Sequence, residues 1–485
     1  NFKDSKASGV WDINEALDLI KGGNWPNAAN INPSAFVDAL FQTHVYDGTG
    51  SARTITNNID LSNKGGLVWI KDRDQSQHHA LFDTSQGATK YLKSSSSAAV
   101  ATRTDTLTSF NSDGFSLGDD SSGALVNSSG QGYVSWTFRE QPKFFDVVTY
   151  TGDNTSSRTI SHNLGSTPGM IICKSTSSGQ WGVWHRSLSG NNGLRLDSNA
   201  AAGGSLLHDS STVNSTSFEV SSGGYVLDNQ NQDYVAYLFA HNNDDGGFGE
   251  PGDQDIIKCG TYTGNAGNPQ LIDIGFEPQF LMVKVASTSG DWFVVDNMRG
   301  VLPNADYGNA NRTIYWNKSD AEIASGNFGF YSTGFAAAQS SSTNGNGVKF
   351  IYMAIRRGGM QTPTAASDVF AVDSLGSTGD GATPAFRSPF VADMGMRVDI
   401  SEAYTEIGAR LIPEKWLYTN LNNTEASASN SDWDYMNGWY TSTSTASNYH
   451  GLMWARARGY FDAVTYSGTG SGSQNVSHNL GVVPE

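Results

Sequence analysis

The chain has 485 residues and a formal net charge of -17 at pH 7, with 16% charged and 11% aromatic residues. Its aromatic content is too high for a disordered chain, and its length suits about three to five domains. Because no Lys or Arg cluster offsets the negative charge, we expect no nucleic-acid partner. No run approaches the roughly 20 apolar residues of a spanning helix, so we also expect no membrane insertion.

The N-terminal segment, residues 1–40, contains the one predicted helix. The sequence from residue 10 to residue 26, VWDINEALDLIKGGNWP, repeats apolar residues at helical spacing and ends in Gly-Gly and Pro. Such a short helix is marginal alone in water and therefore needs a packing partner. The first ten residues, NFKDSKASGV, lack both Met and the apolar core of a secretion signal, so we expect the numbering to begin inside a longer chain.

The rest of the chain repeats one pattern. A marker tyrosine in VYDGTG, TYTGDN, TYTGNA and TYSGTG stands at Tyr46, Tyr150, Tyr262 and Tyr466, with spacings of 104, 112 and 204 residues. The last spacing is close to twice the others, which predicts a diverged fourth copy that opens near residue 364. There, SDVFAVDSLG supplies an apolar run followed by a turn.

Each copy contains the same series of predicted strands. A second strand in GGLVWIKD, GMIICKST and FLMVKVAS includes Lys71, Lys174 and Lys284, which follow the marker tyrosine by 25, 24 and 22 residues. A third strand lies in HHALFDT, QWGVWHRS and DWFVVDNM, and a closing strand in GYVSWTF, DYVAYLF, KFIYMAI and GLMWARA. These runs are rich in β-branched and aromatic residues, as strands are. YVAYLF has apolar residues on both faces, so we expect it to be buried on both sides.

The pattern predicts an all-β protein of tandem β-sandwich, jelly-roll-like domains behind the short N-terminal helix. The predicted boundaries place repeat 1 at 41–143, repeat 2 at 144–250, repeat 3 at 251–357 and a diverged repeat 4 at 358–459. Residues 460–485 begin a further repeat, because VSHNLGVVPE matches ISHNLGSTPG. Units of about 100 residues can each bury a core, so we expect separate domains that follow one another like beads on a string.

The repeats resemble those of a known group of proteins. FFDVVTYTG, RTISHNLGSTPGMIICK, WGVWH and YVAYLFA together are similar to a repeat common in tail-fibre and virion structural proteins of marine tailed phages, especially those of cyanobacteria. The segment SGVWDINEALDLIKGGNWP resembles one found ahead of such repeats. The resemblance implies a rod-like virion appendage, commonly a homotrimer, that contacts other virion proteins and the host envelope. It is weakest from 358 to 459 and carries no catalytic motif.

No catalytic or metal-binding motif occurs in the sequence. The chain lacks HExxH, GxSxG, a Walker loop and a GxGxxG that opens a helix, so we expect no enzyme activity and no cofactor. His78 and His79 would point to opposite faces of a strand, which argues against a shared metal ion. Two alternatives stay open. Carboxylates from different strands could pair as in a glycosidase, and the acidic loops 118–123 and 242–247 could bind calcium rather than form solvated turns.

Four residues have structural interpretations. The only two cysteines, Cys173 and Cys259, lie in β-like runs and are interpreted as free thiols that act as small apolar side chains. His162 and His478 lie in the motif SHNLG, where Asn-Leu-Gly indicates a turn. We expect each of these histidines to make a turn-stabilising hydrogen bond.

Aromatic side chains are the better candidates for ligand contacts. Trp and Tyr combine an apolar face, which suits the C–H surface of a sugar, with a polar edge. The densest group lies in SDWDYMNGWYTS of the diverged fourth copy, with Asp and Asn nearby in a stretch that is typical of a loop. Trp181 and Trp292 occupy the same position in their repeats, which favours a place in the core for both over a ligand contact. The glycan-binding candidates are Trp433, Tyr435, Trp439, Tyr440, Trp181, Trp184 and Trp292.

Three functional hypotheses follow. The first is a non-enzymatic virion appendage of the tail-fibre kind, a rod of repeated β-domains, homotrimeric, that adheres to host surface polysaccharide. In that case several copies on one particle would turn weak contacts into avidity. The second is a purely structural virion fibre or capsid decoration without a host ligand. The third is a polysaccharide depolymerase with a hydrolytic site in a loop.

Overall fold

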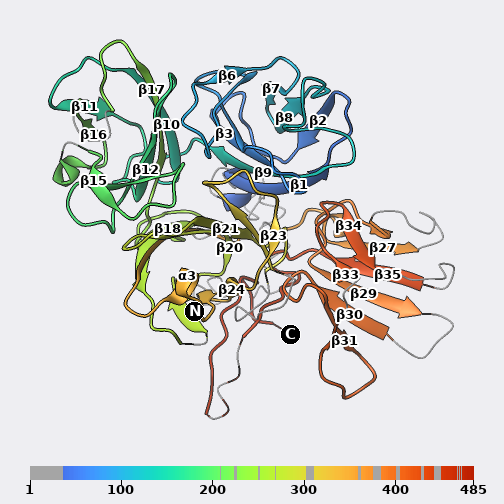
Figure 1. The fold of residues 1–485 in the computed structure, drawn as a ribbon. Coiled ribbons are helices and arrows are strands. Elements are labelled where there is room, and N and C mark those ends of the chain that lie inside the picture. The colour runs from blue at the N-terminus through green and yellow to red at the C-terminus, as the bar shows by residue number, and fades with distance from the viewer. Residues whose placement is uncertain are drawn as a thin grey trace, which may run out of the picture.

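A computed structural model describes residues 36–484 apart from 208, 223–226, 250–251, 268, 302–310, 359–361, 375–383, 400–404, 428–430, 442–448, 467, 469 and 471. The helix predicted at residues 10–26 lies outside the described residues. Strands make up 42% of the structure and helices 3%, so the prediction of an all-β fold is confirmed. Figure 1 shows the strands gathered in four units, which we number 1 to 4 in chain order.

The first two units hold seventeen strands. Unit 1 comprises η3 (Val37–Ala39), β1 (Phe41–Asp47), β2 (Arg53–Thr56), β3 (Gly66–Asp72), β4 (Ala80–Asp83), β5 (Lys90–Tyr91), β6 (Ala101–Thr102), β7 (Leu107–Asn111), β8 (Gly114–Leu117) and β9 (Gly132–Arg139). Unit 2 comprises β10 (Phe145–Thr151), β11 (Arg158–Ser161), β12 (Met170–Ser175), β13 (Trp181–His185), β14 (Asn192–Arg195), β15 (Gly203–Ser205), η4 (Ser210–Thr212), β16 (Ser217–Val220) and β17 (Asp233–Phe239).

The other two units hold eighteen strands. Unit 3 comprises β18 (Ile257–Thr263), β19 (Gln270–Asp273), β20 (Pro278–Val285), β21 (Trp292–Asp296), β22 (Arg312–Tyr315), β23 (Ile323–Ala324), β24 (Phe328–Tyr331), β25 (Gly334–Ala337), α3 (Ser341–Asn344) and β26 (Lys349–Arg356). Unit 4 comprises η6 (Ala366–Asp368), β27 (Phe370–Ser374), β28 (Phe386–Arg387), β29 (Met394–Asp399), β30 (Thr405–Ala409), β31 (Lys415–Tyr418), β32 (Ala426–Ser427), β33 (Ser431–Asp432), β34 (Gly438–Thr441) and β35 (Tyr449–Trp454).

The four units share one strand order. The large sheets run β1-β9-β3-β4, β10-β17-β12-β13-β14-β15, β18-β26-β20-β21-β22-β23 and β27-β35-β29-β30-β31-β32, so the first and last strands of each unit are always neighbours. A smaller sheet holds the second strand of each unit: β2-β8-β7, β11-β16, β19-β25-β24 and β28-β34-β33. Strand β27 lies within the run SDVFAVDSLG, where the fourth copy is expected to open. The boundaries between repeats stay a prediction.

The marker tyrosine has the same surroundings in three units. Tyr46, Tyr150 and Tyr262 are buried in the first strand of units 1, 2 and 3. Each hydroxyl donates to a backbone carbonyl in the segment before the last strand, and the acceptors are Val126 at 2.8 Å, Leu227 at 2.9 Å and Thr343 at 2.6 Å. Each ring also stacks on an aromatic ring of that last strand. The repeated motif therefore ties together the two ends of a unit.

The large sheets of units 1 to 3 bury both faces. One face of the sheet in units 1 and 3 packs on the smaller sheet and forms a core within the unit. The opposite faces of all three sheets meet in a single apolar cluster, which we call the shared core; it includes Trp136, Tyr237 and Met353. The expectation of separate domains arranged like beads is therefore wrong for units 1 to 3. The prediction that YVAYLF is buried on both sides is confirmed, since all six of its residues are buried.

Equivalent backbone hydrogen bonds connect the three units in a cycle. The N–H of Val100 in unit 1 donates to Thr176 of unit 2 at 2.8 Å, and the N–H of Ala202 in unit 2 donates to Ala286 of unit 3 at 2.8 Å. The N–H of Glu322 in unit 3 then donates to Arg73 of unit 1 at 2.7 Å. Each acceptor lies two residues after the lysine that recurs in the repeats. Units 1 to 3 thus form a closed ring with head-to-tail contacts.

Two further layers of contacts repeat around the ring. Trp181 of unit 2 donates from Nε1 to Lys93 of unit 1 at 2.9 Å, and Trp292 of unit 3 donates in the same way to Arg195 of unit 2 at 3.0 Å. In unit 1 the same position is His79, whose Nε2 lies 3.0 Å from the carbonyl oxygen of Tyr315 in unit 3. In the deeper layer, buried polar side chains of neighbouring units bond to each other. The Tyr237 hydroxyl of unit 2 donates to Asp83 of unit 1 at 2.9 Å, and the Trp136 indole N–H of unit 1 donates to Asp296 of unit 3 at 3.0 Å.

The recurring lysines support the turns that carry these contacts. Lys71, Lys174 and Lys284 are buried, and each ammonium group donates to the backbone carbonyl of the next residue, which is the last of its strand. Lys71 and Lys174 also donate to Gln75 and Ser177 in the turns that follow. Lys284 also donates to Ala200 of unit 2 at 3.0 Å. Burial lowers the pKa of all three lysines to about 8. Because a buried ammonium group without hydrogen-bond acceptors is costly, these lysines favour the observed turn geometry.

The shared core predicts that units 1 to 3 unfold together. Replacement of Trp181 by Ala would leave a cavity between units 1 and 2 and should lower the free energy of unfolding by about 3–5 kcal/mol. Differential scanning calorimetry should show one transition for the ring, moved as a whole to lower temperature. Leu271→Ala, at a side chain that is 55% exposed in unit 3, is the control and should change the free energy of unfolding by about 0.5 kcal/mol or less. A transition that splits by unit would contradict the shared core.

Candidate functional site

The structure places the predicted tryptophans in cores. Trp181 and Trp292 are 0% exposed and Trp184 is 5% exposed, all within the shared core. Trp433 and Trp439 are 2% and 1% exposed, and they stack on each other inside unit 4 with ring centroids 5.1 Å apart. A sugar ring needs an exposed indole face, and none of these five tryptophans has one.

The fold of unit 4 explains why its aromatic group is inside. Its large sheet has glycines at Gly395 and Gly408. A Cβ at Gly395 would lie 2.4 Å from the indole of Trp439 and would collide with it, and a Cβ at Gly408 would lie 3.1 Å from the indole of Trp433, a tight contact. The indoles therefore lie directly on the backbone of the sheet. Tyr435 is half-buried, and its carbonyl accepts a hydrogen bond from Arg410. Nothing is described of the Tyr440 side chain, so for these two tyrosines a ligand contact stays a prediction.

Other sequence interpretations concern polar residues. The ring Nδ1 of His162 accepts from the N–H of Leu164 at 3.2 Å, and His478 accepts from Leu480 at the same distance, so the predicted turn hydrogen bonds are confirmed. Both cysteines are free and buried, as interpreted. Within the described part of the chain no group of three or more His, Cys, Asp or Glu side chains could hold a metal ion. In loop 118–123, Asp120 accepts three backbone N–H bonds from residues 125–127.

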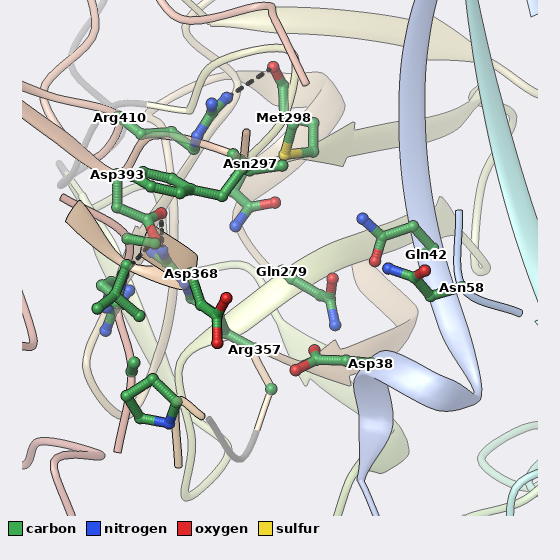
Figure 2. Close-up of a pocket in the computed structure, with 18 of the residues that line it drawn as sticks. Asp38, Gln42, Asn58, Gln279, Asn297, Met298, Arg357, Asp368, Asp393 and Arg410 are labelled. Atoms are coloured by element: carbon green, nitrogen blue, oxygen red, sulfur yellow. Dashed lines mark hydrogen bonds and ion pairs between the residues drawn. The ribbon is translucent and has the colours of Figure 1, made fainter. Parts of the chain in front are cut away.

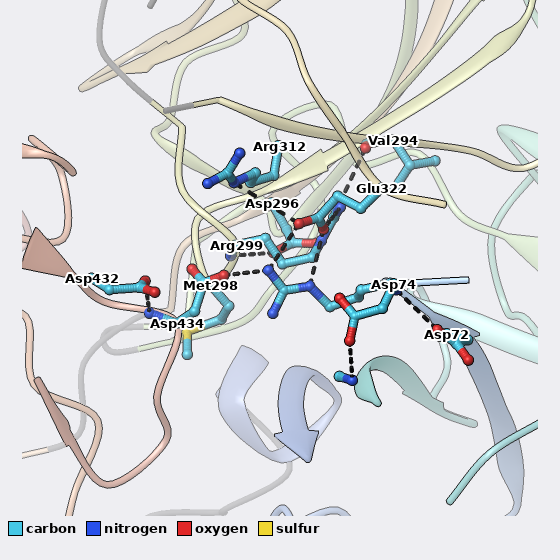
Figure 3. Close-up of polar contacts among 12 residues, drawn as sticks. Asp72, Asp74, Val294, Asp296, Met298, Arg299, Arg312, Glu322, Asp432 and Asp434 are labelled. Atoms are coloured by element: carbon cyan, nitrogen blue, oxygen red, sulfur yellow. Dashed lines mark hydrogen bonds and ion pairs between the residues drawn. The ribbon is translucent and has the colours of Figure 1, made fainter. Parts of the chain in front are cut away.

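A network of buried charges joins unit 4 to the ring. Arg299 donates to Asp296 at 2.7 Å and to Glu322 at 2.9 Å, both within unit 3. Glu322 also pairs with Arg73 of unit 1 at 2.8 Å, and Arg73 contacts Asp434 of unit 4. Figure 3 shows Glu322 beside Arg299, with Asp434 on the side of unit 4. The network therefore meets where three units come together.

The pKa values follow from this arrangement. Burial alone would raise the pKa of Glu322, but Arg73 and Arg299 outweigh it and lower the pKa to about 2. Burial raises the pKa of Asp434 to about 6 in spite of Arg73. Glu322 is thus the carboxylate that the two arginines share, while Asp296 pairs with Arg299 and Asp434 pairs with Arg73.

A cavity of about 630 Å³ opens beside this network, between units 1, 3 and 4. Figure 2 shows amide and carboxyl groups directed into it from separate elements: Gln42 of β1, Gln279 of β20 and Asp368 of η6. Asp38 lies at its edge, next to Gly358, where a side chain would come within 2.2 Å of the Asp38 carboxyl. Burial raises the pKa of Asp38 to about 6, which Arg357 partly opposes.

The charged groups of the cavity wall are paired with one another. Arg357 bonds to Glu277 at 3.2 Å and also pairs with Asp393, and Arg456 bonds to Glu277 at 2.9 Å. Arg410 donates to the backbone carbonyl of Ala392 at 3.0 Å. Since these arginines are already neutralised or hydrogen-bonded, the cavity does not select a strongly anionic ligand.

Two buried polar atoms, on residues that line the cavity, have no hydrogen-bond partner among the described residues. They are Oγ1 of Thr43, a residue that is 1% exposed, and Oδ1 of Asn297, a residue that is 8% exposed. Buried polar groups are normally hydrogen-bonded, so such atoms indicate a place for a donor from outside the protein. Phe390 adds an aromatic side chain to the lining. The arrangement suits a neutral molecule with several hydroxyl groups.

Sequence reasoning could not identify this cavity. Its residues lie in short stretches such as FQTH of repeat 1 and EPQF and VVDN of repeat 3, which are far apart in the sequence. None of these stretches carries a motif, and the residues meet only because unit 4 packs against the ring. The position of the cavity depends on contacts between units, which the spacing of the repeats does not specify.

Comparison with known families identifies the ring as a family domain. Residues 33–357 match the family described as "Domain of unknown function (DUF7483)", and since this is about two thirds of the chain, the protein belongs to that family. The matched region covers units 1 to 3 and ends before unit 4. Comparisons with curated proteins and with solved structures found no match. No helix in the described part of the chain is long and apolar enough to cross a membrane.

The charge network predicts a pH-dependent effect of Glu322→Gln. The variant removes the carboxylate that Arg73 and Arg299 share, which leaves two buried arginines with one carboxylate partner each, and should lower the free energy of unfolding at pH 7 by about 3–5 kcal/mol. Because the pKa of Glu322 is about 2 in the folded protein and 4.5 in a free side chain, its contribution is complete above pH 4.5 and is lost as the pH falls through 2.

Chemical denaturation at several pH values measures this effect. The difference between wild type and Glu322→Gln should shrink below pH 4.5. The control is Asp320→Asn on the same loop, whose side chain is 57% exposed and which should have little effect. An equal loss of stability at pH 7 and pH 2.5 would mean that the charge of Glu322 is not what stabilises the junction.

Proposed function

We propose that this protein is a non-enzymatic component of a phage virion appendage, of the tail-fibre kind, that adheres to host surface glycans. The virion role is supported by the motifs FFDVVTYTG and RTISHNLGSTPG and by the tandem β units that contain them. Closure of units 1 to 3 into one ring gives a compact module with little exposed apolar surface. Such a module suits a protein that must stay folded outside the cell as part of a particle.

One observation carries the non-enzymatic part of the proposal. The titratable groups buried between the units are bonded to structural partners, as in Asp83 to Tyr237, Asp296 to Trp136 and Arg299, and Lys284 to backbone carbonyls. Catalytic acids and bases need a free position next to a substrate, and these groups have none. A structural role accounts for their burial without any chemistry.

The glycan part of the proposal is supported by the cavity between units 1, 3 and 4. Amide groups donate and accept hydrogen bonds at once, as sugar hydroxyls do, and Gln42, Gln279 and Asn297 bring three of them to one place. A volume of about 630 Å³ lies within the range of small-molecule sites, which is about 300–1,000 Å³. A glycan end of one or two sugar residues is the ligand class that we propose.

The burial of five tryptophans favours a second candidate, a structural virion fibre or capsid decoration without a host ligand. Adhesive surfaces normally display aromatic side chains, and here the tryptophans are used in cores. The two candidates differ in whether the cavity binds a sugar, and that difference can be measured.

Glycan binding should depend on the two unpartnered atoms of the cavity. We expect a glycan array or saturation-transfer NMR to detect at least one neutral oligosaccharide, and Thr43→Val with Asn297→Leu to weaken its binding at least about tenfold. Because neither atom has a partner in the part of the chain that the structure describes, the substitutions should not lower the thermal stability. Asn163→Ala, at an exposed asparagine in unit 2, is the control. Binding that is unchanged in the double variant would exclude the cavity.

The virion role is tested separately. Immunogold electron microscopy of purified particles that carry a tagged copy of this chain should place label on an appendage or on the particle surface. Label that is absent from intact particles, with the tagged protein present in the infected cell, would contradict the proposal.

A further inference from the structure

The two buried atoms without a partner among the described residues lie at the contact between units 1 and 3. Thr43 of β1 is paired across the sheet with Trp136 of β9, and residues paired in this way project from the same face. The indole N–H of Trp136 donates to Asp296 of unit 3 at 3.0 Å, and Asn297 is the next residue along the chain. Thr43 and Asn297 therefore approach the cavity from two units, next to one hydrogen bond between those units.

The two atoms differ in the hydrogen bonds that they can make. Oδ1 of Asn297 is a carbonyl oxygen and can only accept, whereas the hydroxyl of Thr43 can also donate. The position of Asn297 is fixed, because its backbone N–H donates to the carbonyl of Gln279 at 3.0 Å. A ligand that satisfies both atoms brings a donor to Asn297 and an acceptor to Thr43. A secondary amide carries both in one rigid group, as an N–H and a carbonyl oxygen.

The charged donors of the cavity wall are already used. Arg357 and Arg456 pair with Glu277, and Arg410 donates to backbone carbonyls. In contrast, the carboxyl group of Asp368, which only accepts when it is ionised, is directed into the cavity (Figure 2). A hydroxyl group adds two acceptor lone pairs for each donor, whereas an amide nitrogen adds a donor alone. The cavity therefore favours an N–H over an O–H at its unpartnered carbonyl oxygen.

Apolar side chains line the cavity together with these polar atoms. Met298 directly follows Asn297, and Phe390 and Val391 belong to unit 4. Val391 packs against the shared core, of which Met298 is a member, so the two provide an apolar surface that suits a methyl group. Phe390 is half-buried, unlike the five tryptophans in cores, and an aromatic side chain that keeps part of its surface accessible can pack on the C–H face of a sugar.

We propose that the cavity between units 1, 3 and 4 recognises a sugar by an N-acetylamino group. This inference rests on the proposed glycan binding and names the class of sugar. The N–H of the acetylamino group donates to Oδ1 of Asn297, and its carbonyl oxygen accepts from the hydroxyl of Thr43. Its methyl group lies against Met298 and Val391, and the sugar ring faces Phe390.

Binding measured by saturation-transfer NMR with the whole chain tests the inference. The probes are the methyl β-glycosides of N-acetylglucosamine and N-acetylgalactosamine, together with those of glucose, galactose and glucosamine. At least one N-acetylated sugar should bind at least about tenfold more tightly than its parent with a hydroxyl group, because the parent leaves Asn297 and the apolar surface without their partners. The protons of the acetyl methyl group should receive the strongest saturation.

Two variants separate recognition of the acetylamino group from general contact with the sugar ring. Asn297→Ala should remove the preference for the N-acetylated sugar and change the affinity for the parent sugar by about threefold or less. Phe390→Ala should weaken both sugars by a similar factor and leave the preference intact. The control is Asn163→Ala in unit 2. Because Oδ1 of Asn297 has no partner among the described residues, the unfolding temperature of Asn297→Ala should stay that of the wild type.

The results distinguish failure of this inference from failure of glycan binding. Equal affinity for the N-acetylated and parent sugars would overturn the inference and leave the glycan proposal intact. Tighter binding of the glucosamine glycoside would overturn it as well, since the cavity would then select a positive charge. A preference that persists in Asn297→Ala would show that this residue does not read the acetylamino group. Absence of binding by every glycoside and by every oligosaccharide of a glycan array would contradict both proposals.

Discussion

The structure depends on one constraint: in units 1 to 3 the central strands of each large sheet are buried on both faces, and both faces must be removed from water. A small sheet of three strands or fewer covers one face within the unit. Nothing within the unit covers the other, and apolar area left in water costs about 25 cal/mol per Å². The sibling units provide the cover, and three of them complete it. A single repeat would therefore be incomplete as a folding unit, which agrees with a family domain that spans residues 33–357 and not one repeat.

Polar groups give this apolar association its register. An apolar face alone would allow the sheets to slide, but a buried indole N–H or carboxylate is satisfied in one position only. Trp136 donates to Asp296 and Tyr237 donates to Asp83 at equivalent positions around the ring. The third such position is occupied differently, since His185 of unit 2 lies 3.1 Å from the carbonyl oxygen of Tyr352 in unit 3. The contact is thus conserved in position between the repeats, while the chemical groups vary.

The sequence predicted the strands and the repeats, because both depend on local patterns of apolar residues and on spacing. It did not predict the ring, because closure depends on which units touch. Two signals were present. YVAYLF has no polar face for solvent, and Trp181 and Trp292 recur at one repeat position next to a recurring lysine. In this fold, a tryptophan that recurs opposite a lysine on the paired strand packs between repeats. The prediction that it contacts a ligand treated each unit as a separate domain.

Unit 4 shows what happens when the neighbour changes. Its own core still forms, with two indoles packed against glycines of the large sheet, and its strand order is that of the other three units. The differences lie at the positions that face other units: Val398 and Thr405 replace the lysine and tryptophan, and Arg410 reaches the Met298 carbonyl of unit 3 at 3.5 Å. Divergence of the fourth repeat is therefore explained by a different set of neighbours. It joins the ring through charged groups, with Asp434 paired to Arg73 of unit 1 and Asp393 paired to Arg357 of unit 3.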